Sequence, residues 1–383
     1  AGTITLSGAL GNSTPITSLT ATGAAINLGG NISTRDVASN NVSLTGAVTL
    51  TGNITIDTNN TTNDGNKTFT GAVSSDNPAT TPRNITLDAG AGTITPNGNF
   101  DVGIFDLVSG TWNQASTAGT YSFTADDFRI TGGTFKRFLS GTGADAANAY
   151  LINDIYGLQG AGSSGMLGAY YKLNNNINAS GTSSWNSGSG FAPIGTAVSN
   201  FTGNLNGNNK TITGLYINRS TTNYVGLFGY ANNASVYDLG LLNVNITGRQ
   251  RTGALAGYVR VSSGSITNCY STGSVSSTDY YVGGLVGTLY DGTLSNSYST
   301  AGISAVSYGM AGGLVGDTYS SASISNSYAT GNVSGAEFIG GFIGYNGGTI
   351  SNSYAAGTVT GTSYEAGGFA GENAGTISRS YST

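Results

Sequence analysis

The amino-acid sequence predicts an all-β protein that folds as a parallel β-helix (β-solenoid), in which short strands wind into stacked coils. Three observations predict this class. The 383 residues include 62 Gly, only 5 Pro and 38% hydrophobic residues, a composition that suits a folded core and neither collagen nor a disordered chain. Two sequence markers recur together about every 28 residues in the C-terminal half. No repeat contains ten or more residues with helical periodicity.

The first marker is Gly-Gly-Leu-Val-Gly, and successive copies follow at steps of 28, 30, 29, 28 and 27 residues. Its variants end at Gly229, Gly257, Gly287, Gly316, Gly344 and Gly371. The second marker is Ile-Ser-Asn-Ser-Tyr, whose alternation is typical of a strand. Its tyrosines are Tyr270, Tyr298, Tyr328, Tyr354 and Tyr381. Because two independent markers keep one period, we expect one coil per 27–30 residues, stacked at the spacing of neighbouring strands.

Such stacking would align equivalent residues of successive coils in columns. An apolar column is expected to be buried and comprises Ile266, Leu294, Ile324, Ile350 and Ile377. A second interior column would pair its side-chain amides along the stack, and Arg379 would interrupt it; it comprises Asn268, Asn296, Asn326 and Asn352. The column that holds Cys269 and Ser327 could face either way. Glycine pairs such as Gly312-Gly313 would allow a backbone approach that a Cβ forbids.

Differences in the repeat pattern of the sequence divide the chain into three parts. Residues 1–137 carry looser apolar dyads, such as Val42/Leu44 and Val48/Leu50, which predict irregular solenoid coils. Residues 138–200 are expected to form a junction, with a short helix that Asn153 or Asp154 caps. Residues 201–383 hold the regular repeats. Both ends of the chain resemble cuts through a longer protein.

The side chains that most catalytic chemistry requires are scarce. The chain has no His and one Cys, which excludes Ser-His-Asp and Cys-His catalysis and Cys-based zinc sites. Asp126 and Asp127 are adjacent, so on a strand they would point to opposite faces; we expect both in a solvated loop. Asp279, Glu337 and Glu365 each precede a Gly-Gly turn, and a solvent-facing edge is favoured over a calcium site. We therefore expect no enzyme activity, cofactor or metal.

Charge and hydropathy limit the partners. The net charge is −5, from 13 Lys+Arg and 18 Asp+Glu, and no basic stripe suggests nucleic acid as a partner. No stretch approaches the roughly 18 apolar residues of a membrane-spanning helix.

The repeats also resemble a known family. The segment from Gly283 to Val333 (GGLVG, LSNSYST, AGGLVG, ISNSYATGNVSG) resembles the GLUG repeat of bacterial surface proteins. Upstream, 151–195 and 201–217 resemble the segment that precedes GLUG repeats in filamentous-haemagglutinin-like exoproteins. The resemblance implies a right-handed β-helix, export by two-partner secretion and a location outside the cell, at the bacterial surface. It carries no catalytic residues to this chain.

Three functions remain open from these observations. The first is a non-catalytic shaft of a large surface adhesin that mediates attachment or biofilm formation. The second is a self-assembling fibre or surface-layer subunit, and the third is a β-helix carbohydrate-active enzyme, which would need charged residues clustered on one face. Expected partners are host or environmental glycans, surface receptors or copies of the same chain.

Overall fold

The computed structural model describes residues 2–306, 309–363 and 365–383. The chain divides into two compact units. Unit 1 comprises residues 1–141, 151–166 and 184–187, and unit 2 comprises 142–150, 167–183 and 188–383. Three elements have residues in both units: β14 (Tyr150–Ile152), the 3₁₀ helix η1 (Ser180–Ser184) and α2 (Trp185–Gly188).

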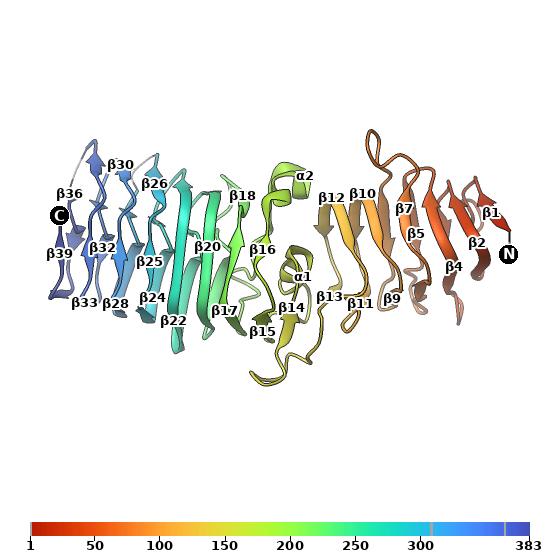
Figure 1. Cartoon of the computed structure of the whole chain (residues 1–383), viewed down its shortest axis with the longest axis horizontal. Helices are drawn as coiled ribbons and strands as arrows, with labels where there is room; N and C mark the ends of the chain where they lie inside the picture. The colour runs from red at the N-terminus through yellow and green to blue at the C-terminus, as the bar shows by residue number, and fades with distance from the viewer. Residues whose placement is uncertain (1, 307–308, 364) are drawn as a thin grey trace. The chain divides into compact units, whose positions relative to one another are not determined.

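Unit 1 is built on one sheet of parallel strands (Figure 1). Its strands are β1 (Thr3–Leu6), β2 (Leu19–Leu28), β3 (Ile32–Ser33), β4 (Val42–Leu50), β5 (Ile54–Asp57), β6 (Lys67–Phe69), β7 (Val73–Ser75), β8 (Ile85–Asp88), β9 (Thr93–Pro96), β10 (Phe100–Leu107), β11 (Thr111–Gln114), β12 (Phe123–Ile130) and β13 (Thr134–Arg137). The predicted dyads lie in register between coils, as Val48 opposite Val73 shows. Both dyads of β4 are buried, which confirms the solenoid prediction for this unit.

The short helix that the sequence predicted after Asn153 or Asp154 is present, and it lies in unit 1. Helix α1 (Ile155–Gly160) begins after Asp154, whose carboxylate accepts a hydrogen bond from the backbone N–H of Gly157. This is a standard N-cap.

Unit 2 stacks the regular coils. Its remaining strands are β15 (Tyr170–Leu173), β16 (Ile177–Asn178), β17 (Asn204–Thr213), β18 (Tyr216–Asn218), β19 (Phe228–Asn232), β20 (Ser235–Gly248), β21 (Thr252–Gly253), β22 (Ala256–Ser277), β23 (Val282–Gly283), β24 (Val286–Ser295), β25 (Tyr298–Ser299), β26 (Gly302–Ala305), β27 (Ala311–Gly312), β28 (Val315–Ser325), β29 (Tyr328–Ala329), β30 (Val333–Gly335), β31 (Ile339–Gly340), β32 (Ile343–Asn346), β33 (Thr349–Ser351), β34 (Tyr354–Ala355), β35 (Val359–Gly361), β36 (Ala366–Gly367), β37 (Ala370–Asn373), β38 (Thr376–Ser378) and β39 (Tyr381–Ser382).

Successive coils of unit 2 lie in parallel register at the predicted period. Leu294 lies opposite Ile324, and Ile324 opposite Ile350, so that equivalent strands run side by side in Figure 1. The apolar column is buried from Ile266 to Ile350, and Ile377 is half-buried. The tyrosine column is also confirmed: the rings of Tyr298 and Tyr328 stack with centroids 4.6 Å apart and planes 5° apart. The fold is therefore a parallel β-solenoid with coils of about 28 residues.

The glycine pairs make the close approach that we expected. A Cβ on Gly312 would collide with the carbonyl oxygen of Val315, and one on Gly313 with the carbonyl oxygen of Gly341 in the next coil. The marker therefore keeps these glycines because backbone occupies the space where a side chain would stand.

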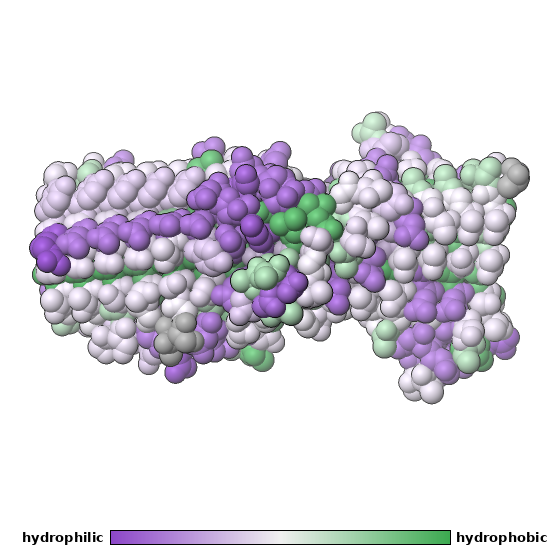
Figure 2. Space-filling model, turned by 60° about the horizontal axis from the view of Figure 1, so that its bottom comes forward, coloured by the Kyte–Doolittle hydropathy of each residue, from purple (hydrophilic) through white to green (hydrophobic). Residues whose placement is uncertain are grey.

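The prediction of an interior asparagine column is wrong. Asn268, Asn296, Asn326 and Asn352 are exposed, and their φ angles lie between 50° and 53°. A left-handed residue turns the chain and restarts the inside–outside alternation, so the Asn side chain does not share the face of the preceding Ile. A continuous hydrophilic stripe runs along this unit in Figure 2, as an exposed Asn column would produce.

The serine column takes the interior position instead. Ser297 and Ser327 are buried, and so are Cys269 and Ser353. Each Ser hydroxyl donates to a backbone carbonyl two residues earlier, as Ser327 Oγ does to Ser325 at 2.7 Å. Each Ser hydroxyl also accepts a hydrogen bond from the backbone N–H of the equivalent residue in the preceding coil, as Ser327 Oγ does from Ser297 at 3.3 Å. The hydrogen-bonded interior column that we assigned to Asn is thus made by Ser.

The expectation of a solvated loop at Asp126 and Asp127 is wrong. Both residues lie in strand β12, where Asp126 is exposed and Asp127 is buried. The Asp127 carboxylate pairs with Arg129 at 2.5 Å and accepts from the backbone N–H of Asn186 at 2.6 Å. These hydrogen bonds anchor the backbone of α2, in which Asn186 and Ser187 have positive φ angles and are therefore left-handed. The role of Asp127 in unit 1 is structural.

Candidate binding pocket

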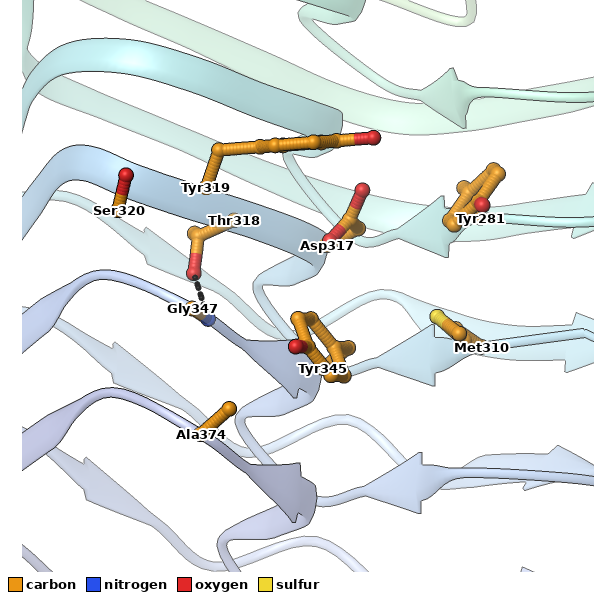
Figure 3. Close-up of a pocket in the computed structure, with 9 residues that line it drawn as sticks. All are labelled: Tyr281, Met310, Asp317, Thr318, Tyr319, Ser320, Tyr345, Gly347 and Ala374. Carbon is orange, nitrogen blue, oxygen red and sulfur yellow. Dashed lines mark hydrogen bonds between the residues drawn. The ribbon is translucent and has the colours of Figure 1, made fainter.

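A pocket of about 450 Å³ opens on the side of unit 2 (Figure 3). Strand β28 supplies the acidic and polar part of its wall, including Asp317 and Thr318. Three tyrosines supply the aromatic part: Tyr281, Tyr319 and Tyr345 come from three successive coils. Its lining is completed by Met310, Ser320, Gly347 and Ala374.

The coil register brings these residues together. Asp317 lies opposite Thr288 of the preceding coil and Tyr345 of the following one. The same column continues to Tyr258 on one side and to Glu372 on the other. Each member follows the last glycine of the Gly-Gly-Leu-Val-Gly marker directly. The column therefore places one freely varied side chain per coil next to a fixed backbone.

Asp317 is the most unusual group of the pocket. Its side chain is only 3% exposed, yet it lines the cavity. No other described residue forms a hydrogen bond or an ion pair with its carboxylate. Burial raises the pKa of this carboxyl to about 7, and the positive charge of Arg251 acts in the opposite direction.

Arg251 lies beside the aromatic wall. Its guanidinium stands over the rings of Tyr281, Tyr258 and Tyr224, at 4.9, 5.7 and 5.5 Å from their centroids. Such stacking on π faces suits a guanidinium better than an ammonium. Its Nε is buried and has no hydrogen-bond partner within the described residues.

Unsatisfied polar atoms gather near this wall. Within the described part of the chain, the buried atoms without a partner include Thr252 Oγ1 and Thr288 Oγ1, besides Arg251 Nε. Thr288 is the register neighbour of Asp317, and the backbone N–H of Thr252 donates to the carbonyl of Tyr281 at 2.9 Å. Buried polar groups are nearly always paired in native proteins, so a cluster of exceptions suggests bound solvent or ligand.

A buried lysine in unit 1 has a different character. Burial lowers the pKa of Lys67 to about 7, and its Nζ donates to Thr58 Oγ1 and to the carbonyl of Asp88, each at 2.6 Å. The side chain is fully enclosed, so no substrate reaches it. Its role is to satisfy interior acceptors.

None of the columns predicted from the sequence lines the pocket. The single cysteine, Cys269, is enclosed in the serine column, and burial raises the pKa of its thiol to about 12. It therefore fills a Ser-like packing position, as the repeat suggested.

Asp279 pairs with Arg249 at 3.4 Å and with Gln250 at 2.7 Å. Within the described residues, no group of three or more acidic or Cys side chains could hold a metal ion.

Asp317 was not predicted as a site residue from the sequence, although a signal was present. The residue after each marker glycine is Tyr, Tyr, Thr, Asp, Tyr and Glu in successive coils, whereas the marker itself contains only glycine and apolar residues. A variable position beside an invariant backbone is where a repeat protein can place a binding site without disturbing its stack.

Comparison with known proteins supports the repeat assignment. Three segments match the GLUG motif: residues 278–304, 307–334 and 335–360. Halomucin of Haloquadratum walsbyi is 36% identical over 211 residues, which make up 52% of this chain and 2% of halomucin. A protein of Evansella cellulosilytica named "Putative Gly-rich membrane protein" is 46% identical over 61 residues, 16% of this chain and 7% of that protein. The chain thus spans a small part of either relative.

A solved structure shares the fold. It is described as a "putative immunoglobulin A1 protease from Bacteroides ovatus" and superposes with a TM-score of 0.53 at 23% identity. The match covers 63% of this chain and 76% of that one. In the described residues, no helix has the length and apolarity that a membrane span requires.

Proposed function

We propose that this chain, a solenoid with GLUG repeats, is a non-catalytic structural and adhesive segment of a large extracellular surface protein that attaches cells to other surfaces or to one another. The observation that carries the proposal is the parallel alignment of equivalent side chains in columns along unit 2, with a pocket on its flank. A stack whose interior is fixed by its repeats can present varied side chains along its length.

The small share of each relative that the chain matches supports the idea of a segment in a longer protein. The resemblance of residues 151–217 to filamentous-haemagglutinin-like exoproteins extends the proposal to export by two-partner secretion and location at the bacterial surface.

The chemistry of the pocket favours binding over turnover. Glycoside hydrolysis usually needs two carboxyl groups that flank one bond. Asp317 is the one carboxylate among the described lining residues. Glu372 lies in the same column, roughly 10 Å further along the stack, with Tyr345 between them, and it does not line the pocket.

The proposal is tested with the purified full chain coupled to beads in a flow cell. Beads carrying an unrelated protein at the same density provide the control. We expect cells or surface polysaccharide to retain the chain-bearing beads above the control. Mass spectrometry of the same polysaccharide, incubated with free chain, should find no cleavage products. Retention at the control level would contradict an adhesive role, and release of oligosaccharides would contradict the absence of catalysis.

A further inference from the structure

We infer that the pocket around Asp317 binds a neutral saccharide, whose hydroxyl groups donate hydrogen bonds to the buried carboxylate while its apolar ring faces pack on Tyr319 and Tyr345. This inference rests on the proposed adhesive function and names the ligand class of that site. Asp317 projects into the cavity between Tyr319 and Tyr281 in Figure 3, and Tyr345 closes the neighbouring wall.

The carboxylate requires a partner that donates hydrogen bonds. Burying a carboxyl group without such a partner costs free energy, and side chains at 3% exposure normally find one within the protein. Here the described residues provide none, whereas the cavity in front of Asp317 is large enough for a sugar-sized molecule. The missing partner therefore comes from solvent in the open pocket or from a ligand whose donors replace that solvent.

The charges around the pocket favour a neutral ligand over an ion. Arg251 already places a positive charge near Asp317, which weakens the attraction for a second cation. An anion would be repelled by Asp317 itself whenever that group is ionised. A saccharide avoids both costs because it offers O–H donors without net charge.

The aromatic wall supplies the complementary surface. One face of many pyranose rings carries only C–H groups, which pack on flat aromatic rings as other apolar surfaces do. Tyr319 is 41% exposed, so its ring is accessible from solvent. The hydroxyl of Thr318 is occupied, because it donates to Asn346 Oδ1 at 3.0 Å and accepts from the N–H of Gly347 at 3.2 Å. Among the polar side chains that line the pocket, Asp317, Ser320 and the tyrosines remain as contacts for a ligand.

The tyrosines also continue beyond the pocket. Tyr319 contacts Tyr290, with ring centroids 4.7 Å apart; Tyr290 contacts Tyr258 at 6.0 Å; and Tyr258 contacts Tyr230 at 4.6 Å. This tyrosine row runs along the coil stack and starts at the pocket wall. A saccharide longer than the pocket would lie along the row, so affinity should rise with chain length.

The test uses the full chain and a printed array of neutral gluco-, manno-, galacto- and N-acetylglucosamine oligosaccharides of two to eight sugars. Choline and short lysine peptides form the cationic arm, and sialylated and sulfated sugars form the anionic arm. Hits are measured by titration calorimetry. The variants are Asp317→Asn and Tyr319→Ala. Tyr381→Ala is the matched control, because Tyr381 is exposed in another column and lies outside the pocket.

We expect at least one neutral series to bind, with affinity that increases from two to six sugars. Asp317→Asn and Tyr319→Ala should each weaken binding at least tenfold, while Tyr381→Ala binds like the parent. Asp317→Asn should fold, because it removes a buried charge and keeps the shape of the side chain. Binding only in the charged arms, no binding at all, or equal affinity of the Asp317→Asn variant would overturn the inference.

The outcome separates the two proposals. If beads with the Asp317→Asn variant are retained in the flow cell as strongly as the parent, adhesion stands and the pocket is not its saccharide site. If oligosaccharides bind through Asp317 but the beads retain no cells, the pocket inference stands and the adhesive function fails.

Discussion

The backbone N–H of Ser297 donates a hydrogen bond to the Oγ of Ser327 in the next coil, and the two atoms are 3.3 Å apart. The same bond recurs between Ser327 and Ser353, also at 3.3 Å. Each hydroxyl thus satisfies a buried donor that lies outside the strand ladder. The serine column is a polar seam inside an otherwise apolar core, and it connects each coil to the next.

Replacing Ser327 by Ala should destabilise unit 2 by about 1–3 kcal/mol, because the buried N–H of Ser297 loses its acceptor. Ser327→Cys is the matched control, since Cys269 occupies the same column in an earlier coil. We expect urea denaturation, followed by tyrosine fluorescence, to rank the parent first, Cys second and Ala last. If Ala equals the parent, the serine bonds contribute nothing to the stack.

Asn326 should matter for its backbone rather than for a buried amide. Its φ is 50°, and its exposed Oδ1 accepts from Asn352 Nδ2 at 3.2 Å. Asn326→Ala should cost about 1–2 kcal/mol, because the left-handed conformation strains a residue with a Cβ and Ala lacks the local bonds of Asn. Asn326→Gly should cost less than Asn326→Ala, because Gly adopts this conformation freely. Thermal melts that rank Ala above Gly would exclude this explanation.

Gly312 and Gly302 form a matched pair in unit 2. A Cβ on Gly312 would strike the carbonyl oxygen of Val315, whereas one on Gly302 would find its nearest neighbour at 4.0 Å. Gly312→Ala should therefore destabilise the protein by about 3 kcal/mol. Gly302→Ala should be neutral or stabilising, by less than about 1 kcal/mol, because Ala restricts the unfolded chain. Thermal melts followed by circular dichroism measure the stability of both variants. Equal melting midpoints would contradict the steric explanation.

The stability of unit 2 should fall as the pH rises from about 4 to 7. The folded pKa of Asp317 is raised from 3.8 to about 7, so the folded state holds a proton that the unfolded state has already released. Among the residues that the structure describes, the titratable groups that face it are Arg251, Tyr281, Tyr319 and Tyr345. The loss should not exceed about 4 kcal/mol.

The variant Asp317→Asn removes this dependence on pH. Urea denaturation of the parent and the variant at pH 4.5 and pH 8 measures it. We expect Asp317→Asn to gain stability relative to the parent between the two pH values. A constant difference would show that Asp317 ionises in the folded protein as freely as in water.

The repeat period made much of unit 2 predictable. Two markers with the same step size define which residues of successive coils are neighbours. Parallel stacking in this register pairs the backbone hydrogen-bonding groups of each coil with those of the next and places identical side chains side by side. The columns of Ile324 and Tyr328 and the glycine pairs follow from that register alone. A helix cap at Asn153 or Asp154 was predictable for a different reason, since a cap depends on only a few consecutive residues, and the structure selects Asp154.

The asparagine column shows where pattern reasoning failed. Alternation predicts the face of each residue only while the backbone remains extended. At Asn326 one left-handed residue breaks this rule, and Ser327 points inward instead. Asn and Ser are both compatible with turns and with strand surfaces, so their identity did not reveal which residue carries the turn.

By itself, the sequence determined the fold class, the coil length and the members of each column, because these depend on the repeat period of the sequence. Only the tertiary structure decided that the Ser column faces inward and the Asn column outward, and where a pocket opens. Asp317, Tyr281 and Tyr345 are 28 to 64 residues apart in the chain and meet only through stacking. Burial then changes the chemistry of Asp317, since removal of water disfavours its charge. Neither the contact among these three side chains nor the desolvation of Asp317 can be read from a short stretch of sequence, because both arise only when the coils are stacked.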